Sequence, residues 1–238
     1  VSNTYNSLLY SNHRITYFDT ELNDQIWRNS LSEFDNTIDN LKSTITVEKV
    51  DSKGRLFHTG VQFKRSDVSP ESFEYWEDVP PTESDEFSGN TQVDTYSGFA
   101  EISGDLMANS AIKIGVRSSL FCYDDESEFH INPRVLISSD VTERFGFNFY
   151  SQMSSQDVHL VTLNSFGFIP ELWVAPSKTK PIERSWTTGL KLNYTGESTS
   201  IFVDAYLRGM SNLLEFSENV DFNQNTSEIV EHGITSNG

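Results

Sequence analysis

Apolar and polar residues alternate along most of this chain, and the alternation persists over long stretches. In the stretch 111–123, Ile, Val and Leu alternate with Lys, Gly, Arg and Ser, and 184–195 and 199–210 show the same pattern. A period of two is that of a β-strand, whose successive side chains lie on opposite faces. No stretch holds an apolar stripe at the helical period of about 3.6 residues over three turns. The sequence therefore predicts an all-β fold.

The alternating stretches predict nine strands, and we expect a tenth to begin near Ile229. Most span 12–15 residues, against about 5–6 for strands of soluble proteins. A tilted strand that crosses a membrane needs about 9–11 residues within the hydrocarbon. The expected strands are 7–18, 35–49, 55–68, 94–107, 111–123, 128–139, 144–157, 184–195 and 199–210.

The connections alternate in length along the chain. Long ones are expected at 19–34, 69–93, 158–183 and 211–228, short ones at 51–54, 108–110, 140–143 and 196–198, and a medium one at 124–127. An antiparallel meander places alternate connections at opposite ends of its strands, so one end would carry only tight turns and the other only larger loops. Outer-membrane barrels have this layout. We expect a single domain over 1–238, an up-and-down meander of about 9–10 long strands that forms an open or partial segment of a transmembrane β-barrel.

The two phases of the alternation differ in charge. One phase is apolar with aromatic residues near the strand ends: Tyr17, Phe145, Trp186 and Tyr194. The other phase carries Glu48, Lys64, Lys113, Arg117, Lys191, Asp204 and Arg208. A charge on the lipid-facing side at mid-depth costs roughly 2–4 kcal/mol, so charges in one phase only suit a water-facing lumen. A soluble sheet with one wet face gives the same alternation but explains the strand length and the loop asymmetry less well.

Composition excludes several classes of function. The net charge of −18 argues against nucleic acid as a partner, because phosphates are bound by Lys and Arg. Acidic residues are concentrated at 71–86 and 124–128, which we interpret as solvated loops. Binding of divalent cations by these loops is the alternative, although neither matches the D-x-[DN]-x-[DN]-G pattern of calcium loops.

No motif for catalysis or for a cofactor is present. Cys122 is the only cysteine and is expected to pack within a strand. The histidines show no HExxH pattern and no serine lies in GxSxG, so zinc and nucleophilic chemistry lack a signature. His130 and His159 are expected to be hydrogen-bonded strand residues. We expect no enzymatic activity, no metal site and no cofactor.

No apolar run of 18 residues and no secretory leader pattern occur, so neither a transmembrane helix nor a signal peptide is expected. The chain begins and ends within the repeating pattern, and we expect it to be a piece of a longer protein.

A loop rich in proline and aromatic residues precedes the expected strand 184–195. It reads Gly167-Phe-Ile-Pro170-Glu-Leu172-Trp173-Val174-Ala-Pro176 and is followed by Lys180-Pro181. This loop resembles the "GLP-x-DLWVP … KP" loop of TonB-dependent outer-membrane receptors. The phrases SGFAEISGDL…IKIGVRS (97–118), FHINPRVL (129–136), HLVTL (159–163) and LRGMSNLLE (207–215) also resemble that family, in the family's order. Phe168-Ile169 and Ala175 depart from the loop pattern.

The resemblance implies a function for the complete protein. It implies a barrel in the outer membrane of the cell that binds a scarce solute outside and imports it when the TonB complex pulls on a plug. The plug, the TonB box and the closing aromatic strand of the family have no counterpart in this chain. The lipid bilayer, the TonB complex and an unidentified solute are the expected partners. The charges expected in the lumen are mixed and show no preference for one class of solute.

The prolines of this loop are expected to keep its backbone irregular, because proline fixes φ and donates no hydrogen bond. Leu172, Trp173 and Val174 are expected to pack against a neighbouring loop or the barrel wall. The alternative is that Trp173 stacks on a ligand, as aromatic residues do in binding sites. Loss of stability in Trp173→Ala favours packing, whereas loss of uptake with an intact barrel favours the ligand.

A soluble surface module is the competing function. A β-sandwich that recognises a glycan uses the same alternation, exposed aromatic residues and acidic loops. The two hypotheses differ in whether the chain needs detergent to stay folded and monomeric. A hydrolase is the third possibility, but it lacks any motif.

Overall fold

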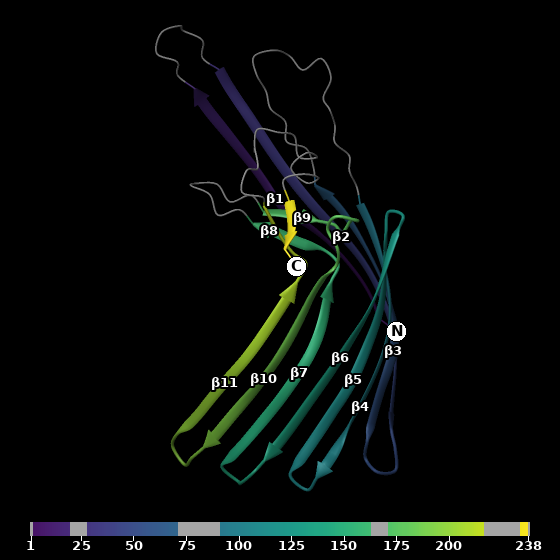
Figure 1. The fold of residues 1–238 in the computed structure, drawn as a ribbon, viewed down its shortest axis with the longest axis vertical. Helices are drawn as coiled ribbons and strands as arrows, with labels where there is room; N and C mark the ends of the chain where they lie inside the picture. The colour runs from purple at the N-terminus through teal and green to yellow at the C-terminus, as the bar shows by residue number, and fades with distance from the viewer. Residues whose placement is uncertain (1, 20–27, 71–90, 163–170, 217–233, 238) are drawn as a thin grey trace.

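The computed structural model describes residues 2–19, 28–70, 91–162, 171–216 and 234–237. Nine long strands form one antiparallel sheet in the order β1-β2-β3-β4-β5-β6-β7-β10-β11 (Figure 1). Each strand pairs with the one before it in this order. The strands are β1 (Ser2–Asp19), β2 (Arg28–Val50), β3 (Leu56–Pro70), β4 (Thr91–Met107), β5 (Ser110–Tyr123), β6 (Glu126–Asp140), β7 (Phe145–Gln156), β10 (Glu183–Thr195) and β11 (Ser200–Ser211).

The sheet is an open meander, because β1 and β11 are its two edges and do not pair with each other. The expected all-β fold, with its up-and-down antiparallel order and open edges, is confirmed. Within the described residues no helix is long and apolar enough to span a membrane.

The strand limits agree with the sequence pattern except at the start of the chain. For β3 to β7, β10 and β11 the ends differ from the expected ones by a few residues at most, whereas β8 and β9 lie in the expected loop 158–183 and were not predicted. β1 and β2 begin earlier than expected, at Ser2 and Arg28 rather than at positions 7 and 35. Their first segments contain Asn at positions 3, 6 and 29, and Asn has low β propensity. They are nevertheless strands because the two pair with each other from Ser2↔Thr44 to Asp19↔Arg28.

Tight turns connect the strands at one end of the sheet (Figure 1). They lie between β2 and β3, β4 and β5, β6 and β7, and β10 and β11. The other end carries the long connections, but the β5–β6 connection there is a turn of only Asp124 and Asp125. The expectation that this end holds only larger loops is therefore wrong. Asp124 has φ of 46°, a left-handed conformation that Asp tolerates and that permits a short hairpin.

The connection between β7 and β10 folds back onto the sheet. It contains β8 (His159–Thr162) and β9 (Glu171–Val174), which pair with each other. We call β8, β9 and residues 175–182 the cap. Val158 and the cap residue Trp173 pack with Ile38 of β2 and Val68 of β3, and Ile182 packs with a second cluster on β4 and β5. The cap thus covers one face of the sheet near its long-connection end.

The last strands do not extend the meander. β12 (Leu213–Phe216) and β13 (Ile234–Asn237) pair only with each other, and Leu214 and Ile234 pack against Val161 and Val174 of the cap. The expected tenth long strand near Ile229 is therefore not a strand of the large sheet at 234–237, and residues 229–233 lie outside the described part of the chain.

Candidate functional site

The register of the strands divides their side chains between two faces. Cα partners in adjacent strands project to the same side of a sheet, and successive residues alternate. Lys42, Lys64, Thr95 and Phe121 are partners in successive strands. We call the face that they share the inner face, and the opposite one the outer face. Glu48, Lys113, Arg117, Lys191, Asp204 and Arg208 also fall on the inner face, as the sequence predicts.

The outer face is apolar and carries no charge over its central part. This holds for the outer-face positions between 41 and 47, 57 and 63, 96 and 102, 112 and 120, 129 and 137, 145 and 153, 186 and 194, and 201 and 207. Its large side chains are exposed: Val61 is 58% exposed, Ile114 49% and Phe129 61%. The apolar face thus has no protein cover within the described residues.

Aromatic side chains lie toward both ends of the outer face. Phe145 and Tyr194 are Cα partners at the tight-turn end. Trp186 lies toward the other end of β10, and Phe63 and Tyr96 form an aromatic pair with ring centroids 5.3 Å apart. The side chain of Tyr17 lies outside the described part of the structure.

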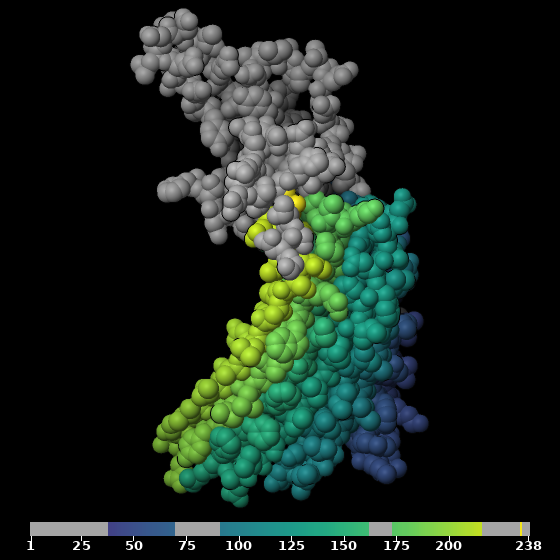
Figure 2. Space-filling view, in the orientation of Figure 1, coloured from purple at the N-terminus to yellow at the C-terminus, as the bar shows by residue number. Residues whose placement is uncertain are grey.

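The inner face is polar and partly covered. Ser97 and Ser119 are 6% and 3% exposed, whereas their outer-face neighbours Tyr96 and Leu120 are 50% and 38% exposed. The curved sheet and the cap, which lies where the strands meet the long connections (Figures 1 and 2), enclose this side.

A cavity of about 640 Å³ lies on the inner face, and we call it the hollow. Its lining comes from β2 through β7 and from Asp157, directly after β7. It includes Lys42, Thr44, His58, Gln62, Lys64, Thr95, Ser97, Phe99, Arg117, Ser119, Phe121, Asn132, Arg134, Gln152, Ser155 and Asp157. Sites for small molecules typically occupy about 300–1,000 Å³, so the hollow is of suitable size for a solute.

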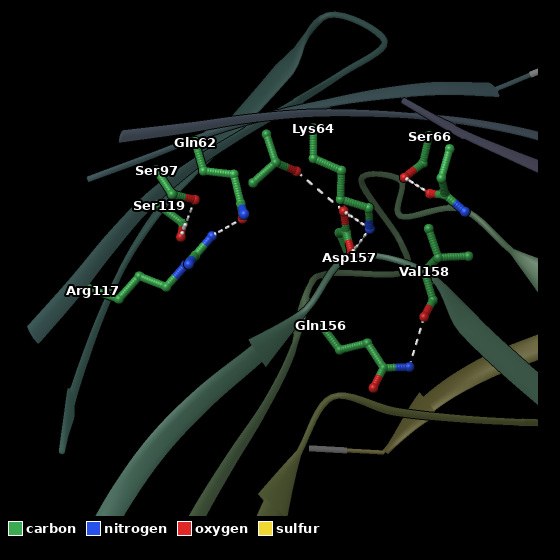
Figure 3. Close-up of polar contacts among 11 residues, drawn as sticks. Gln62, Lys64, Ser66, Ser97, Arg117, Ser119, Gln156, Asp157 and Val158 are labelled. Carbon is green, nitrogen blue, oxygen red and sulfur yellow. Dashed lines mark hydrogen bonds and ion pairs between the residues drawn. The ribbon is translucent and has the colours of Figure 1, made fainter. Parts of the chain in front are cut away.

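Asp157 holds the long-connection end of the hollow together. The Lys64 ammonium donates to both carboxylate oxygens of Asp157 at 2.9 Å, and the Thr95 hydroxyl donates to Oδ2 at 3.1 Å (Figure 3). These bonds join the end of β7 to β3 and β4, which are not its neighbours in the sheet. The carboxylate is largely buried, with 12% of its side chain exposed, so each of these charge-assisted bonds is stronger than a surface ion pair.

Arg117 lies beside this cluster and contacts neutral groups. Its guanidinium donates to the side-chain oxygen of Gln62, and Figure 3 shows its side chain extended toward that residue. The guanidinium carbon lies 5.9 Å from the ring centroid of Phe99, within reach of a cation–π contact. Ser97 and Ser119 are hydrogen-bonded to each other at 2.9 Å nearby (Figure 3).

A chain of hydrogen bonds closes another side of the hollow. Tyr123 donates to Glu128, and the other carboxylate oxygen of Glu128 lies 3.1 Å from Nε2 of His130. Nδ1 of His130 lies 2.7 Å from the Ser155 hydroxyl, which donates to the Asn132 side-chain oxygen at 3.1 Å. His130 is therefore a hydrogen-bonded strand residue, as expected.

His159 differs from that expectation. It lies in β8 of the cap, 3% of its side chain is exposed, and neither ring nitrogen has a hydrogen-bond partner within the described structure. Its Nδ1 is 3.4 Å from Glu183, but burial lowers the pKa of His159 despite that carboxylate, because desolvation disfavours the charged imidazole. The neutral ring then behaves as a packing group of the cap.

A second cavity of about 810 Å³ lies toward the tight-turn end of the inner face. Its charged lining is paired. Glu101 bonds Arg134 at 2.6 Å and Lys113 at 3.4 Å, and Lys191 lies 3.5 Å from Asp204. Glu48 also lines this cavity, so with Asp204 beside it the three carboxylates balance the three cations, and the cavity has no net attraction for either sign of solute.

The motif loop is only partly visible. Gly167 and Pro170 lie outside the described residues, and so does the side chain of Leu172. Trp173 is half-buried against Ile38, Val68 and Val158, and Val174 is buried with Val161 and Ile234. Pro176 is fully buried, and Pro181 directly precedes the buried Ile182. Trp173 thus packs on the large sheet and Val174 packs within the cap and against β13, in agreement with the packing role that the sequence favours for both.

Sequence reasoning missed several residues of the hollow. Gln62, Ser97, Ser119 and Asn132 are uncharged and match no motif. Their phase in the alternation was available as a signal, since each falls in the same phase as the charged residues. Asp157 lies at the end of an expected strand, where no pattern shows the direction of a side chain.

The described residues hold no group of three or more His, Cys, Asp or Glu side chains placed to bind a metal ion. The acidic segment 71–86 lies outside them. No protein-family model and no curated protein matches the chain.

Proposed function

We propose that this chain forms part of the wall of a transmembrane β-barrel through which a solute is imported across the outer membrane. One observation carries the proposal: the apolar face of the sheet is exposed and free of charge over its central part, while the polar face is the enclosed one. A soluble sheet of this size buries its apolar face. The reverse arrangement suits lipid outside and water inside.

The resemblance of the motif loop and its neighbouring phrases supports TonB-dependent receptors as the family. In that family the imported solute is taken up from outside, and the TonB complex acts through a plug that lies inside the barrel. We accordingly propose that the long-connection end, with the cap, is the extracellular end and that the hollow faces the path of the solute. The role is transport rather than catalysis.

The competing module, a glycan-binding β-sandwich, requires a second sheet on the apolar face. Within the described residues, the two smaller sheets belong to the cap and its neighbour, and the cap packs on the polar face. The described residues therefore supply no layer that would bury the core of a sandwich.

Detergent dependence tests the proposal. The 238-residue chain, refolded with and without detergent micelles, is compared by sedimentation and by circular dichroism in the far ultraviolet. We expect β structure and a single small species only in micelles, because the outer face needs an apolar environment. A folded, monomeric chain in buffer alone would exclude the membrane barrel.

A further inference from the structure

The hollow is electropositive although the protein is acidic. Its lining contains four cationic side chains, Lys42, Lys64, Arg117 and Arg134, and one carboxylate, Asp157. The whole chain has a net charge of −18. Cations gathered at one cavity of an acidic chain attract and orient anions there.

Two of these cations are neutralised by the protein itself. Lys64 is bonded to Asp157 at 2.9 Å and Arg134 to Glu101 at 2.6 Å. Arg117 and Lys42 differ, because neither forms an ion pair with a carboxylate of the described residues. Arg117 donates to the neutral Gln62 side chain, and Lys42 is exposed to the hollow. Two positive charges are therefore available to a ligand.

The two free charges belong to one site. Lys42 is the Cα partner of Lys64, and the next inner-face pair along the same two strands is Thr44 and Gln62. Arg117 reaches Gln62 from the other side, across β4. Lys42 and Arg117 thus flank a polar floor of Thr44, Gln62 and the Ser97–Ser119 pair. Figure 3 shows Arg117 beside Gln62 and this serine pair.

We propose that the hollow binds a small organic anion through its carboxylate or phosphate oxygens, with Arg117 and Lys42 supplying the charges. A guanidinium presents parallel N–H groups that match two oxygens of such a group. The hydroxyl and amide groups of Ser97, Ser119 and Asn132 supply further polar contacts, and Phe99 contributes an apolar edge. The identity of the anion as the imported solute rests on the proposed function, but its binding to the hollow does not.

Equilibrium binding tests the proposal. The folded chain is titrated at low salt with citrate, with glycerol 3-phosphate and with uncharged glycerol, and heat is measured by isothermal calorimetry. We expect one or both anions to bind and glycerol not to bind. Binding of citrate but not of glycerol 3-phosphate identifies carboxylate as the preferred group. Binding of glycerol 3-phosphate but not of citrate identifies phosphate. Absence of binding by both anions overturns the proposal.

Variants locate the site. Arg117→Gln and Lys42→Gln should each weaken anion binding about tenfold, since a charge-assisted hydrogen bond is lost. Lys53→Gln removes the same charge from the exposed β2–β3 turn and should change binding less than about twofold, because screening weakens distant surface charges. The proposed site is overturned if Lys53→Gln lowers the anion affinity as much as Arg117→Gln and Lys42→Gln do, or if Lys42→Gln does not lower it. If Arg117→Gln does not fold, Lys42→Gln decides the outcome, because Lys42 is exposed and forms no ion pair within the described structure.

The result is independent of the barrel test. A chain that folds only in micelles and binds neither anion contradicts this site and leaves the barrel intact. A chain that folds without detergent and binds an anion at Arg117 and Lys42 contradicts the barrel and leaves the site intact.

Discussion

The two faces of the nine-stranded sheet are built from the same strands, yet they differ in polarity and in exposure. On the inner face, charged and polar side chains are paired across strands and partly enclosed by the cap. On the outer face, aliphatic and aromatic side chains are exposed and no central position is charged. The difference indicates that the two faces are built for different surroundings. On the proposed function, lipid surrounds the outer face and contributes to the stability of the sheet.

The sharpest way to break this comparison is to place a charge on the wrong face. Lys113 lies on the inner face, and Ile114→Lys adds a second lysine at the next position, which lies on the outer face. In a lipid-embedded wall we expect a loss of roughly 2–4 kcal/mol in the free energy of unfolding, measured by urea titration in phospholipid vesicles. A soluble sheet would lose within about 0.5 kcal/mol, as for ordinary surface changes.

The matched control is Gln152→Lys, which adds a lysine at an exposed inner-face position. It should leave the free energy of unfolding nearly unchanged, because water reaches that face. Equal effects of the two lysines would mean that the faces do not differ in environment.

The inner face is tested next by removing its central carboxylate. Asp157→Asn leaves the Lys64 ammonium without its counter-charge in a largely buried place. We expect a loss of about 1.5–3 kcal/mol, the range for hydrogen bonds to charged groups, in the same urea titration. Lys64→Met replaces the ammonium with an uncharged apolar side chain. The double variant Asp157→Asn, Lys64→Met should therefore recover part of the lost unfolding free energy if the penalty comes from the unpaired charge.

Glycine-to-alanine substitutions test how tightly each face is packed. A Cβ at Gly60, on the inner face, would meet the Ile45 carbonyl oxygen and the Phe99 ring, whose Cζ is 2.6 Å away. Gly98, on the outer face, has no atom within 4 Å of such a Cβ. Gly60→Ala should therefore lose about 1–3 kcal/mol through overpacking, whereas Gly98→Ala should gain up to about 1 kcal/mol from reduced freedom of the unfolded chain. Thermal unfolding of both variants checks this contrast.

The smallest effect is expected where the two faces meet, in the tight turn between β2 and β3. The backbone N–H and the guanidinium of Arg55 donate to Asp51 at 2.9 Å and 2.8 Å and lower its pKa below 3.8. A depressed carboxyl pKa stabilises the fold above the unfolded value of about 3.9, and that stability is lost as the pH falls through the folded pKa.

Asp51→Asn keeps the acceptor oxygen and removes the charge. The difference in unfolding free energy between the wild type and this variant should be present at neutral pH, begin to fall as the pH drops below about 4, and vanish only below the folded-state pKa of Asp51. Urea titrations across this range measure it. A difference that persists unchanged in strong acid would show that the charge of Asp51 does not contribute.

Most of the large sheet was predictable from the sequence because its signal is local. A period of two with an apolar phase can be recognised in a strand without knowing its neighbours, so β3 to β7, β10 and β11 agree with the expected limits. The short strands β8 and β9, within the expected loop 158–183, were not predicted. The starts of β1 and β2 were not predictable, because they depend on mutual pairing rather than on propensity. The two-residue β5–β6 turn was missed because the left-handed conformation of Asp124 leaves no pattern in the flanking residues.

The candidate site was predictable only in its parts. The sequence placed Lys64 and Arg117 in the polar phase, and it identified Trp173 and Val174 as packing residues of a loop. The sequence predicted mixed charges on the inner face and no preference for one class of solute. The alternation shows which face a side chain lies on, but it does not show which side chains lie beside it. Separating the paired Lys64 and Arg134 from the free Lys42 and Arg117 required knowledge of which carboxylates lie beside them.

The sequence by itself determined that this protein is a meander of long strands with one polar, charged face and one apolar face without charge over its central part, because both properties follow from the period of the chain. Only the tertiary structure decided that the polar face is the enclosed one, that the connection after β7 returns as a cap, and that Asp157 binds Lys64 across the sheet. Those features depend on the curvature and register of many strands together. Residues that share a face over long separations in sequence come into contact only when the whole sheet has formed.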